Sequence, residues 1–469
     1  MRIVRYVGRT QCRDTKYLRA IDDEKDVLID WVSLNPNATV TFRLNDKALA
    51  PNLRNTLLDF TDLGVFVYLA DEMVSRSDAT DHWTRVLQCL VPVTEPNKWK
   101  ENDSLLSKTL ELLSGDLWKF NWVPLSAPRH VQRHLQRMPR GFDTVCLFSG
   151  GIDSLLGAIQ LLNEGRKVIL VGHQSEGQTA SAQKVLAESL RNMFPGKTCF
   201  VQCRVSRSTR EIPKFDLAPK VERSHRPRSF LFLTLGIGIA AQCGITDVFM
   251  PENGLMALNI PMQKSRIGAL STRTAHPLYM MNIVKLAQSI TGFSGYVRNP
   301  FLTQSKTDML RGLDPSLHSL LLRSISCARP ARFKYKKVRH CGYCVPCIHR
   351  RIAMLEAGID SERDYAFDVF RNLASLDVNK QQDFCAVFRF ATRIADASIT
   401  QLQTMVLSHG HFPATLGSSL GTSETRDYAP WTEMIQRWAI DMLDKLYSAA
   451  SPSTQRFVGL PNRKRSDLR

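Results

Sequence analysis

The chain has 469 residues, enough for two or three domains, and its 43% hydrophobic content excludes a largely disordered protein. Its 62 Lys and Arg outnumber 44 Asp and Glu, and the net charge of +18 favours anionic partners such as nucleotides, nucleic acid or an acidic protein. The sequence contains neither a signal-peptide pattern nor an uninterrupted apolar stretch of about 18 residues, so we expect a cytoplasmic protein without a membrane role.

Residues 1–125 are predicted to form an α+β module without a catalytic cluster, which indicates a scaffold or a partner-docking role. Alternating or apolar runs predict strands at 39–44, 65–69, 86–90 and 117–123. Residues 105–113 have helical spacing, and Gly115 follows them as a residue suited to end that helix. A basic segment interrupted by proline, 126–142, is predicted to be a linker.

From residue 143 the pattern changes to short apolar strands that alternate with helices. The expected strands are 144–148, 167–171, 199–205 and 247–250, and the expected helices are 155–164, 179–194 and 229–242. This alternation predicts a parallel sheet covered on both faces, with ligands at the carboxyl ends of its strands. Residues 206–227, rich in Arg, Lys, Pro and Ser, are predicted to be a lid or a partner-binding loop.

The chain is predicted to become helical towards its C-terminus. Helical apolar spacing occurs at 352–357, 369–376, 382–394, 399–407 and 431–449. We therefore expect a core domain over 143–358 and a helical extension over 359–469.

A hexapeptide, SGGIDS, lies between the first core strand and the first core helix. A strand, a glycine turn and a helix N-terminus form a phosphate cradle, because Gly150 and Gly151 let backbone amides approach the anion and the helix dipole favours its charge. Ser149 and Ser154 add hydroxyl donors, and Asp153 is a candidate ligand for Mg²⁺. No Gly-Lys-Ser/Thr follows, so the motif is not Walker A and instead resembles the PP-loop of ATP pyrophosphatases. The alternative is a turn that only joins strand to helix.

Four cysteines form a second motif, with Cys341, Cys344 and Cys347 at successive two-residue gaps and Cys327 upstream. Four thiolates at these separations suit one tetrahedral structural Zn²⁺, and an iron–sulfur cluster is the chemical alternative. The other seven of the 11 cysteines are scattered, several of them in apolar runs, as expected for buried free thiols in a reducing cytosol.

A PP-loop followed by this C…CGxCxxC arrangement is similar to the 7-cyano-7-deazaguanine synthase (QueC) family, over about residues 143–358. The resemblance implies an adenine nucleotide alpha hydrolase-like core that uses ATP, Mg²⁺ and Zn²⁺. Arg228 opens a stretch that resembles the family's Arg-Asn-hydrophobic helix start, and Lys306 stands in the lysine position of its Thr-Lys-x-Glu segment. By this resemblance Lys306 and Asp153 are the catalytic residues, and Arg228 contacts the nucleotide. His173 is a further candidate for nucleotide binding, although residues 172–176 keep little of the aromatic-Gly-Gln-Arg-His stretch that the family carries after its second strand. The alternative for Lys306 is a solvated lysine at a helix start.

The resemblance fails where the family carries a Gly-Tyr-Pro-Asp-Cys-Arg loop for its deazapurine carboxylate. Residues 251–259 and 268–277 stand in its place, with Asn253, Arg273 and His276 as candidate substrate residues. Arg273 and His276 are suited to bind a carboxylate or to act near an adenylate, and equally to cap a loop only. The chain is also twice as long as the housekeeping synthase, and its additions resemble the QueC-like proteins of anti-phage defence systems, Qat among them.

These features together predict a C–N bond-forming ligase that adenylates a 7-deazaguanine carboxylate, with release of pyrophosphate and then AMP. The acceptor is expected to be a nitrogen nucleophile, an amine of a partner protein from the same operon. One alternative is a tRNA-modifying PP-loop enzyme, in which the basic charge would serve the RNA. Another is a non-catalytic ATP-binding scaffold subunit of a defence complex.

Overall fold

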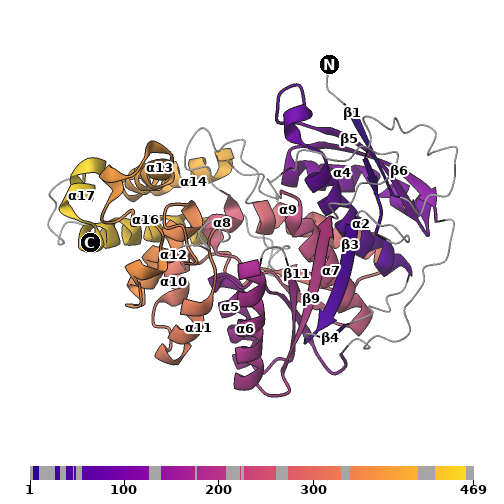
Figure 1. Cartoon of the computed structure of the whole chain (residues 1–469), viewed down its shortest axis with the longest axis horizontal. Coiled ribbons are helices and arrows are strands. Elements are labelled where there is room, and N and C mark those ends of the chain that lie inside the picture. Colours follow the sequence, from indigo (N-terminus) through magenta and orange to yellow (C-terminus); the bar gives the residue numbers. More distant parts are fainter. Residues whose placement is uncertain are drawn as a thin grey trace.

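The computed structural model describes residues 4–9, 27–31, 38–45, 47–48, 55–125, 139–174, 177–207, 222, 226–259, 273–328, 338–409 and 428–460. Within these ranges the chain forms two β-sheets with helices around them, and a group of helices at the C-terminal end (Figure 1). The fold is of the α/β class, as expected. Most of the expected linker 126–142 and most of the expected loop 206–227 lie outside the described residues.

The larger sheet has seven strands in the order β11-β10-β7-β8-β9-β3-β4. These strands are β3 (Ala38–Leu44), β4 (Lys47–Ala48), β7 (Thr144–Leu147), β8 (Val168–His173), β9 (Thr198–Arg207), β10 (Asp247–Phe249) and β11 (Tyr296–Arg298). The strands from β11 to β9 are parallel, whereas β3 is antiparallel to β9 and β4 is antiparallel to β3. The parallel sheet predicted from residue 143 onward is therefore confirmed.

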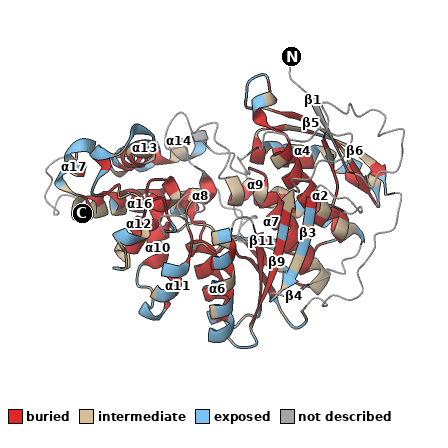
Figure 2. Cartoon of the chain, viewed as in Figure 1, coloured by how far each residue is buried: buried red, intermediate tan, exposed pale blue. Residues whose placement is uncertain are grey.

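Helices cover both faces of this sheet because successive side chains of its central strands enter different apolar cores. Val145 and Leu147 belong to a core shared with α7 (Arg228–Cys243) and α9 (Pro277–Thr291). Cys146 and Phe148 belong to a second core shared with α5 (Ile152–Asn163) and α6 (Gly177–Met193). Every residue of β7 and β8 is buried, as two covered faces require. Figure 2 shows this buried interior in red and the exposed side of α6 in blue.

A second sheet lies in the N-terminal part of the chain, in the order β2-β1-β5-β6, and each of its neighbouring pairs is parallel. Its strands are β1 (Val4–Arg9), β2 (Val27–Ile29), β5 (Val86–Val93) and β6 (Leu117–Pro124). The helices of this part are α2 (Asn55–Met73), α3 (Pro96–Glu101) and α4 (Asp103–Ser114). Gly115, with φ of +74°, ends α4 as predicted.

Helix α2 corrects one prediction, because residues 65–69 are helical and do not form a strand. Most residues of α2 are buried, so its apolar run lacks the one-sided spacing that identifies a surface helix. Helix α2 packs along α7, where a Cβ on Gly64 would lie 1.9 Å from Thr234 Oγ1. The strand predicted at 39–44 is present as β3, but it pairs with β9 of the larger sheet. Both β3 and α2 are therefore built onto the central layer.

The C-terminal region is mainly helical. Its helices, with those that lead to it, are α8 (Gly254–Leu258), α10 (Lys306–Leu310), α11 (His318–Arg323), α12 (Val345–Glu356), α13 (Val378–Ala395), α14 (Ile399–His409), α16 (Ala429–Ala449) and α17 (Pro452–Val458). The helix predicted at 369–376 is wrong, and only a 3₁₀ turn, Leu373–Ser375, forms there. Asp368 accepts hydrogen bonds from the backbone N–H groups of Phe370 and Arg371 at 2.9 and 3.0 Å and so stabilises a turn. In the described ranges no helix is long and apolar enough to span a membrane.

Candidate functional site

The hexapeptide forms a tight turn between the carboxyl end of β7 and the first turn of α5. Gly150 has φ of +82°, a conformation that favours glycine, and a Cβ there would lie 3.0 Å from Gln183 Cγ. Ser149 Oγ accepts a hydrogen bond from the Gly151 N–H at 3.3 Å and lies 3.1 Å from Ser154 Oγ. The backbone N–H groups of this turn stand at the N-terminus of a twelve-residue helix, which is a favourable place for a phosphate.

Gln183, a buried residue of α6, holds this turn in place and was not predicted from the sequence. Its Nε2 donates to the carbonyl oxygens of Phe148 and Ser149, both at 3.2 Å, and of His173 at 3.3 Å. Gln202 Nε2 in turn donates to Gln183 Oε1 at 3.0 Å. A glutamine on the apolar side of a predicted helix was the available signal.

Asp153, in the first turn of α5, is the centre of a buried polar cluster. Its Oδ1 forms an ion pair with Lys306 Nζ, and its Oδ2 accepts from Asn253 N at 3.0 Å and from Asn253 Nδ2 at 2.7 Å. Lys306 is only 7% exposed and begins α10, whose capping box is formed by Ser305 and Asp308. Lys306 is therefore a buried partner of the turn, and not a solvated lysine.

Glu252 is the second carboxyl group in this cluster. Its Oε1 accepts from Asn253 Nδ2 at 3.1 Å. Burial, and next the charge and hydrogen bonding of Asp153, raise the pKa of Glu252 well above its usual value, which favours the protonated form of Glu252 beside Asp153. Burial also pushes the pKa of Asp153 upward, but the Lys306 charge and hydrogen bonds from Glu252, Asn253 and Lys306 outweigh it and hold that pKa below its usual range.

A cavity of about 380 Å³ opens beside this cluster, a volume in the range of small-ligand sites. Its walls come from the hexapeptide, α10, the start of α7, helix α2 and the segment that leads to the cysteines. The lining residues that carry polar groups include Tyr68, Glu72, Ser149, Asp153, Thr179, Arg228, Glu252, Lys306, Ser326, Cys327 and His349. The cavity therefore brings together Ser149, Gly151, Asp153, Arg228 and Lys306 from the predicted nucleotide and catalytic residues.

The remaining predicted residues take supporting positions around this cavity. His173 is fully buried, with its ring edge-on to the rings of Tyr68 at 5.0 Å and Phe232 at 5.7 Å. Asn253 caps the N-terminus of α8 and binds Asp153. His276 caps α9, accepting at Nδ1 from the Leu278 N–H at 3.3 Å.

Arg273 lies in the 3₁₀ turn Arg273–Ala275, and its Nη1 donates to the Leu112 carbonyl oxygen at 3.1 Å. Neither Arg273 nor His276 is among the described residues that line the cavity. Their contacts fit the alternative in which both residues only cap a loop, and substrate binding by either residue stays a prediction.

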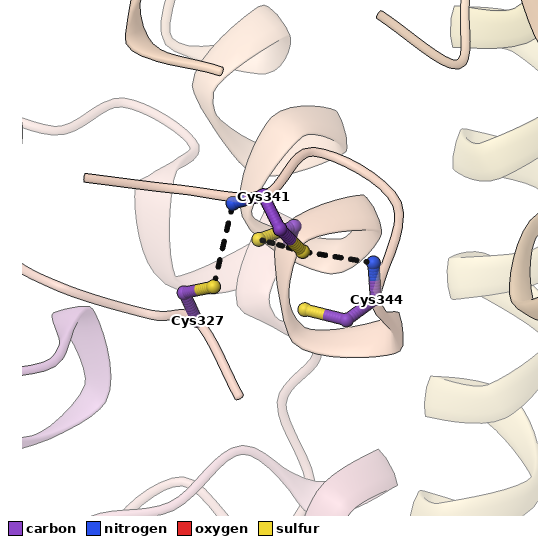
Figure 3. A group of neighbouring side chains, drawn as sticks. Cys327, Cys341 and Cys344 are labelled. Atoms are coloured by element: carbon purple, nitrogen blue, oxygen red, sulfur yellow. Dashed lines mark hydrogen bonds between the residues drawn. The ribbon is translucent and has the colours of Figure 1, made fainter. Parts of the chain in front are cut away.

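The four predicted cysteines meet in one cluster, which is compatible with binding a metal ion such as zinc. Their sulfur atoms all lie within 4.8 Å of one another (Figure 3). Cys341 Sγ and Cys347 Sγ are 3.7 Å apart, close to the separation of about 3.8 Å that a tetrahedron with Zn–S bonds of about 2.3 Å requires. Gly342, with φ of +84°, makes the turn, and a Cβ there would lie 2.0 Å from the Phe367 carbonyl oxygen. The donor set fits a closed structural site.

The cysteine cluster is joined directly to the hexapeptide by residues 325–327. The Ile325 N–H donates to the Gly150 carbonyl oxygen at 2.9 Å, and Ser326 Oγ accepts from the Ile152 N–H at 3.4 Å. The next residue, Cys327, is both a candidate metal ligand and part of the cavity wall. The cysteine cluster therefore supports the turn that faces the cavity.

Helix α16 braces the same region from the C-terminal side. Trp438 Nε1 donates to His349 Nδ1 at 3.2 Å, and His349 lines the cavity. Asp441 of α16 pairs with Arg311 at 2.9 Å, next to α10, and Lys445 pairs with Glu356 of α12 at 2.7 Å. The C-terminal helices are thus attached to the elements that carry Lys306 and the cysteines.

Comparison of the chain with protein-family models, with curated proteins and with solved structures gives no match.

Proposed function

We propose that this protein is an ATP-dependent ligase of the QueC-like PP-loop class. The observation that carries the proposal is that a glycine turn at the carboxyl end of a central parallel strand shares one cavity with the buried Asp153–Lys306 pair. Switch points of parallel sheets are the usual places for nucleotides, and the turn and Lys306 supply donors and positive charge for a triphosphate. Although burial opposes it, the Lys306 charge holds the pKa of Asp153 below its usual range.

The reaction that fits this site has two steps. A carboxylate oxygen of a 7-deazaguanine acid attacks the α-phosphorus of ATP, and the bond to the pyrophosphate oxygen breaks to leave an acyl-adenylate. A nitrogen nucleophile then attacks the acyl carbon, AMP leaves with the bonding electrons, and the nitrogen loses its proton to solvent. Backbone N–H groups of Gly150 and Gly151, together with Lys306, would stabilise the charge of the departing pyrophosphate.

Two metals belong to this proposal. Asp153, with Glu252 beside it, is the carboxylate suited to hold Mg²⁺, which would neutralise phosphate charge when bound. Zn²⁺ would be held by the four cysteines and would serve the fold, because four sulfur ligands leave no open coordination position.

The acceptor is proposed to be an amine of a partner protein, as in an anti-phage conjugation system such as Qat. Charge alone also suits a tRNA substrate, and a scaffold that binds ATP without turnover is the non-enzymatic alternative.

The test is pyrophosphate release by the full chain with ATP, Mg²⁺ and 7-carboxy-7-deazaguanine, in the presence of ammonia, candidate partner proteins or tRNA. Release that requires the acid supports adenylation, and a further requirement for a partner supports conjugation. Release that requires only tRNA, or ATP binding without any release, would refute the proposed reaction. Lys306→Met should abolish release, whereas Lys285→Met, at an exposed position of α9, should not change it.

A further inference from the structure

Helix α2 supplies one wall of the cavity, although it lies outside residues 143–358, over which the chain resembles the QueC family. Tyr68 and Glu72, one helical turn apart on α2, both line the cavity, and Arg228 at the start of α7 lines it beside them. Tyr68 Oη donates to Glu72 Oε1 at 2.9 Å. The N-terminal part of the chain therefore contributes directly to the ligand site.

Helix α2 is held firmly in this position. Near the middle of the helix, Gly64 allows its close approach to α7. Near the C-terminal end of the helix, Asp71 forms a buried ion pair with Arg85, and Arg85 pairs with Asp116 at 2.7 Å. The residue next to Asp71 is Glu72, whose carbonyl oxygen accepts from the Glu222 N–H at 3.1 Å. A side chain on so fixed a backbone is suited to select a ligand by its hydrogen-bonding pattern.

Tyr68 fixes the carboxylate of Glu72 and keeps its own proton. Burial, and next the charge of Glu72, raise the pKa of Tyr68, so its hydroxyl remains a donor at neutral pH. The Arg228 guanidinium lies 5.5 Å from the centroid of the Phe232 ring, and the rings of Phe232 and Tyr68 both contact His173, so Arg228 and Tyr68 lie in the same part of the cavity wall. The cavity wall thus presents the Glu72 carboxylate, an acceptor held in place by Tyr68, together with the Arg228 guanidinium, a donor.

This combination matches one edge of a guanine-type ring. That edge carries two neighbouring donors, the ring N–H and the exocyclic amine, followed by a carbonyl oxygen. A carboxylate accepts from two such donors, and a guanidinium donates to the oxygen. A carboxylate has roughly four acceptor sites and a guanidinium five donors, so both can bind a ligand together with their partners within the protein.

We propose that Glu72, with Arg228 beside it, binds the guanine-type edge of the acid substrate, so that α2 sets the base specificity of the site. The proposal rests on the proposed function, which assigns that acid. The competing ligand is the adenine of ATP, whose edge offers one donor beside one acceptor.

The experiment measures dissociation constants by calorimetry for the full-length wild type and for Glu72→Gln. The probes are ATP, 7-carboxy-7-deazaguanine, and the analogue of that acid that lacks the exocyclic amine. Glu72→Gln should weaken binding of the acid about 10- to 100-fold, because a hydrogen bond to a charged group is lost. It should also remove most of the preference for the acid over the analogue, while ATP binding changes less than about twofold.

Tyr68→Phe should also weaken binding of the acid, but by less than Glu72→Gln does. Glu111→Gln, at an exposed position of α4, serves as the matched control. An unchanged affinity and preference in Glu72→Gln would overturn the inference and leave the proposed function intact. A loss confined to ATP would assign Glu72 to adenine and also overturn it. Wild-type protein that binds ATP but neither acid would overturn the proposed substrate together with the inference.

Discussion

Replacement of Lys306 by methionine tests the buried polar cluster most directly. The substitution keeps much of the side-chain volume and removes the ammonium group, which leaves Asp153 ionised and 6% exposed without its cationic partner. Removal of one partner from a buried ion pair costs about 3–5 kcal/mol. Asn253 still donates two hydrogen bonds to Asp153 in this variant, so we expect a loss of stability at the lower end of that range, about 3 kcal/mol.

A double-mutant cycle measures this coupling. Asp153→Asn alone leaves Lys306 buried without its counter-charge, and the double variant Asp153→Asn/Lys306→Met leaves neither charge. We expect the loss of stability in the double variant to be smaller than the sum of the two single losses by about 2 kcal/mol or more. For a domain of the size of the core expected over residues 143–358, the loss of about 3 kcal/mol in Lys306→Met corresponds to a midpoint temperature of unfolding about 6–12 °C lower in differential scanning fluorimetry.

Each member of the cycle should also lose acid-dependent pyrophosphate release. The exposed Lys285→Met variant should match the wild type in both measurements. Single losses below about 1 kcal/mol, or strictly additive losses, would refute the conclusion that this pair is a strongly coupled buried contact.

Three further predictions address other parts of the molecule. The pKa of Glu252 is raised in the fold by burial and by Asp153, whereas an unfolded glutamic acid ionises near about 4.3. The free energy of unfolding of the wild type should therefore fall as the pH rises from about 4.3 towards the folded-state pKa. The stability of Glu252→Gln relative to the wild type should rise over this range, by at most about 1.4 kcal/mol per pH unit. A difference between the two proteins in urea denaturation that stays constant between about pH 4.5 and 7 would contradict this. Gly64→Ala should lower the free energy of unfolding by about 1–3 kcal/mol, because its Cβ would lie 1.9 Å from Thr234 Oγ1. In the same urea denaturation assay Gly177→Ala should be nearly neutral, because a Cβ at that position would have no neighbour within 4 Å. Cys341→Ser should contain no bound zinc in elemental analysis, and its affinity for ATP should be about tenfold or more weaker, because residues 325–327 link the cysteines to the hexapeptide. Full ATP affinity in the zinc-free variant would refute that link. Cys385→Ser, outside the cluster, is the control.

Local patterns explain which parts of the site could be predicted from the sequence. The hexapeptide and the cysteine cluster each depend on residues that are close in the chain, and the structure brings each set together as expected. Lys306 was assigned by resemblance, and its burial against Asp153 follows from a contact across 153 positions that no local pattern reveals.

Other parts could not be predicted because their patterns are formed by tertiary packing. The apolar run at 65–69 has the composition of a strand, and burial on most sides of α2 removes the one-sided spacing by which a helix is recognised. Tyr68 and Glu72 line the cavity only because tertiary packing places α2 beside α7. The sequence places Glu252 in a loop, and its role depends on its closeness to Asp153.

The position of α16 has a consequence for synthesis on the ribosome. Trp438, Asp441 and Lys445 hold elements that appear 89 to 130 residues earlier in the chain, including those that carry His349 and Lys306. While translation has reached only α14, the strands of the larger sheet can already pair, but the cavity still lacks these braces. The nascent protein should therefore acquire ligand affinity late, and a nonsense codon between α14 and α16 should yield a product without ligand affinity.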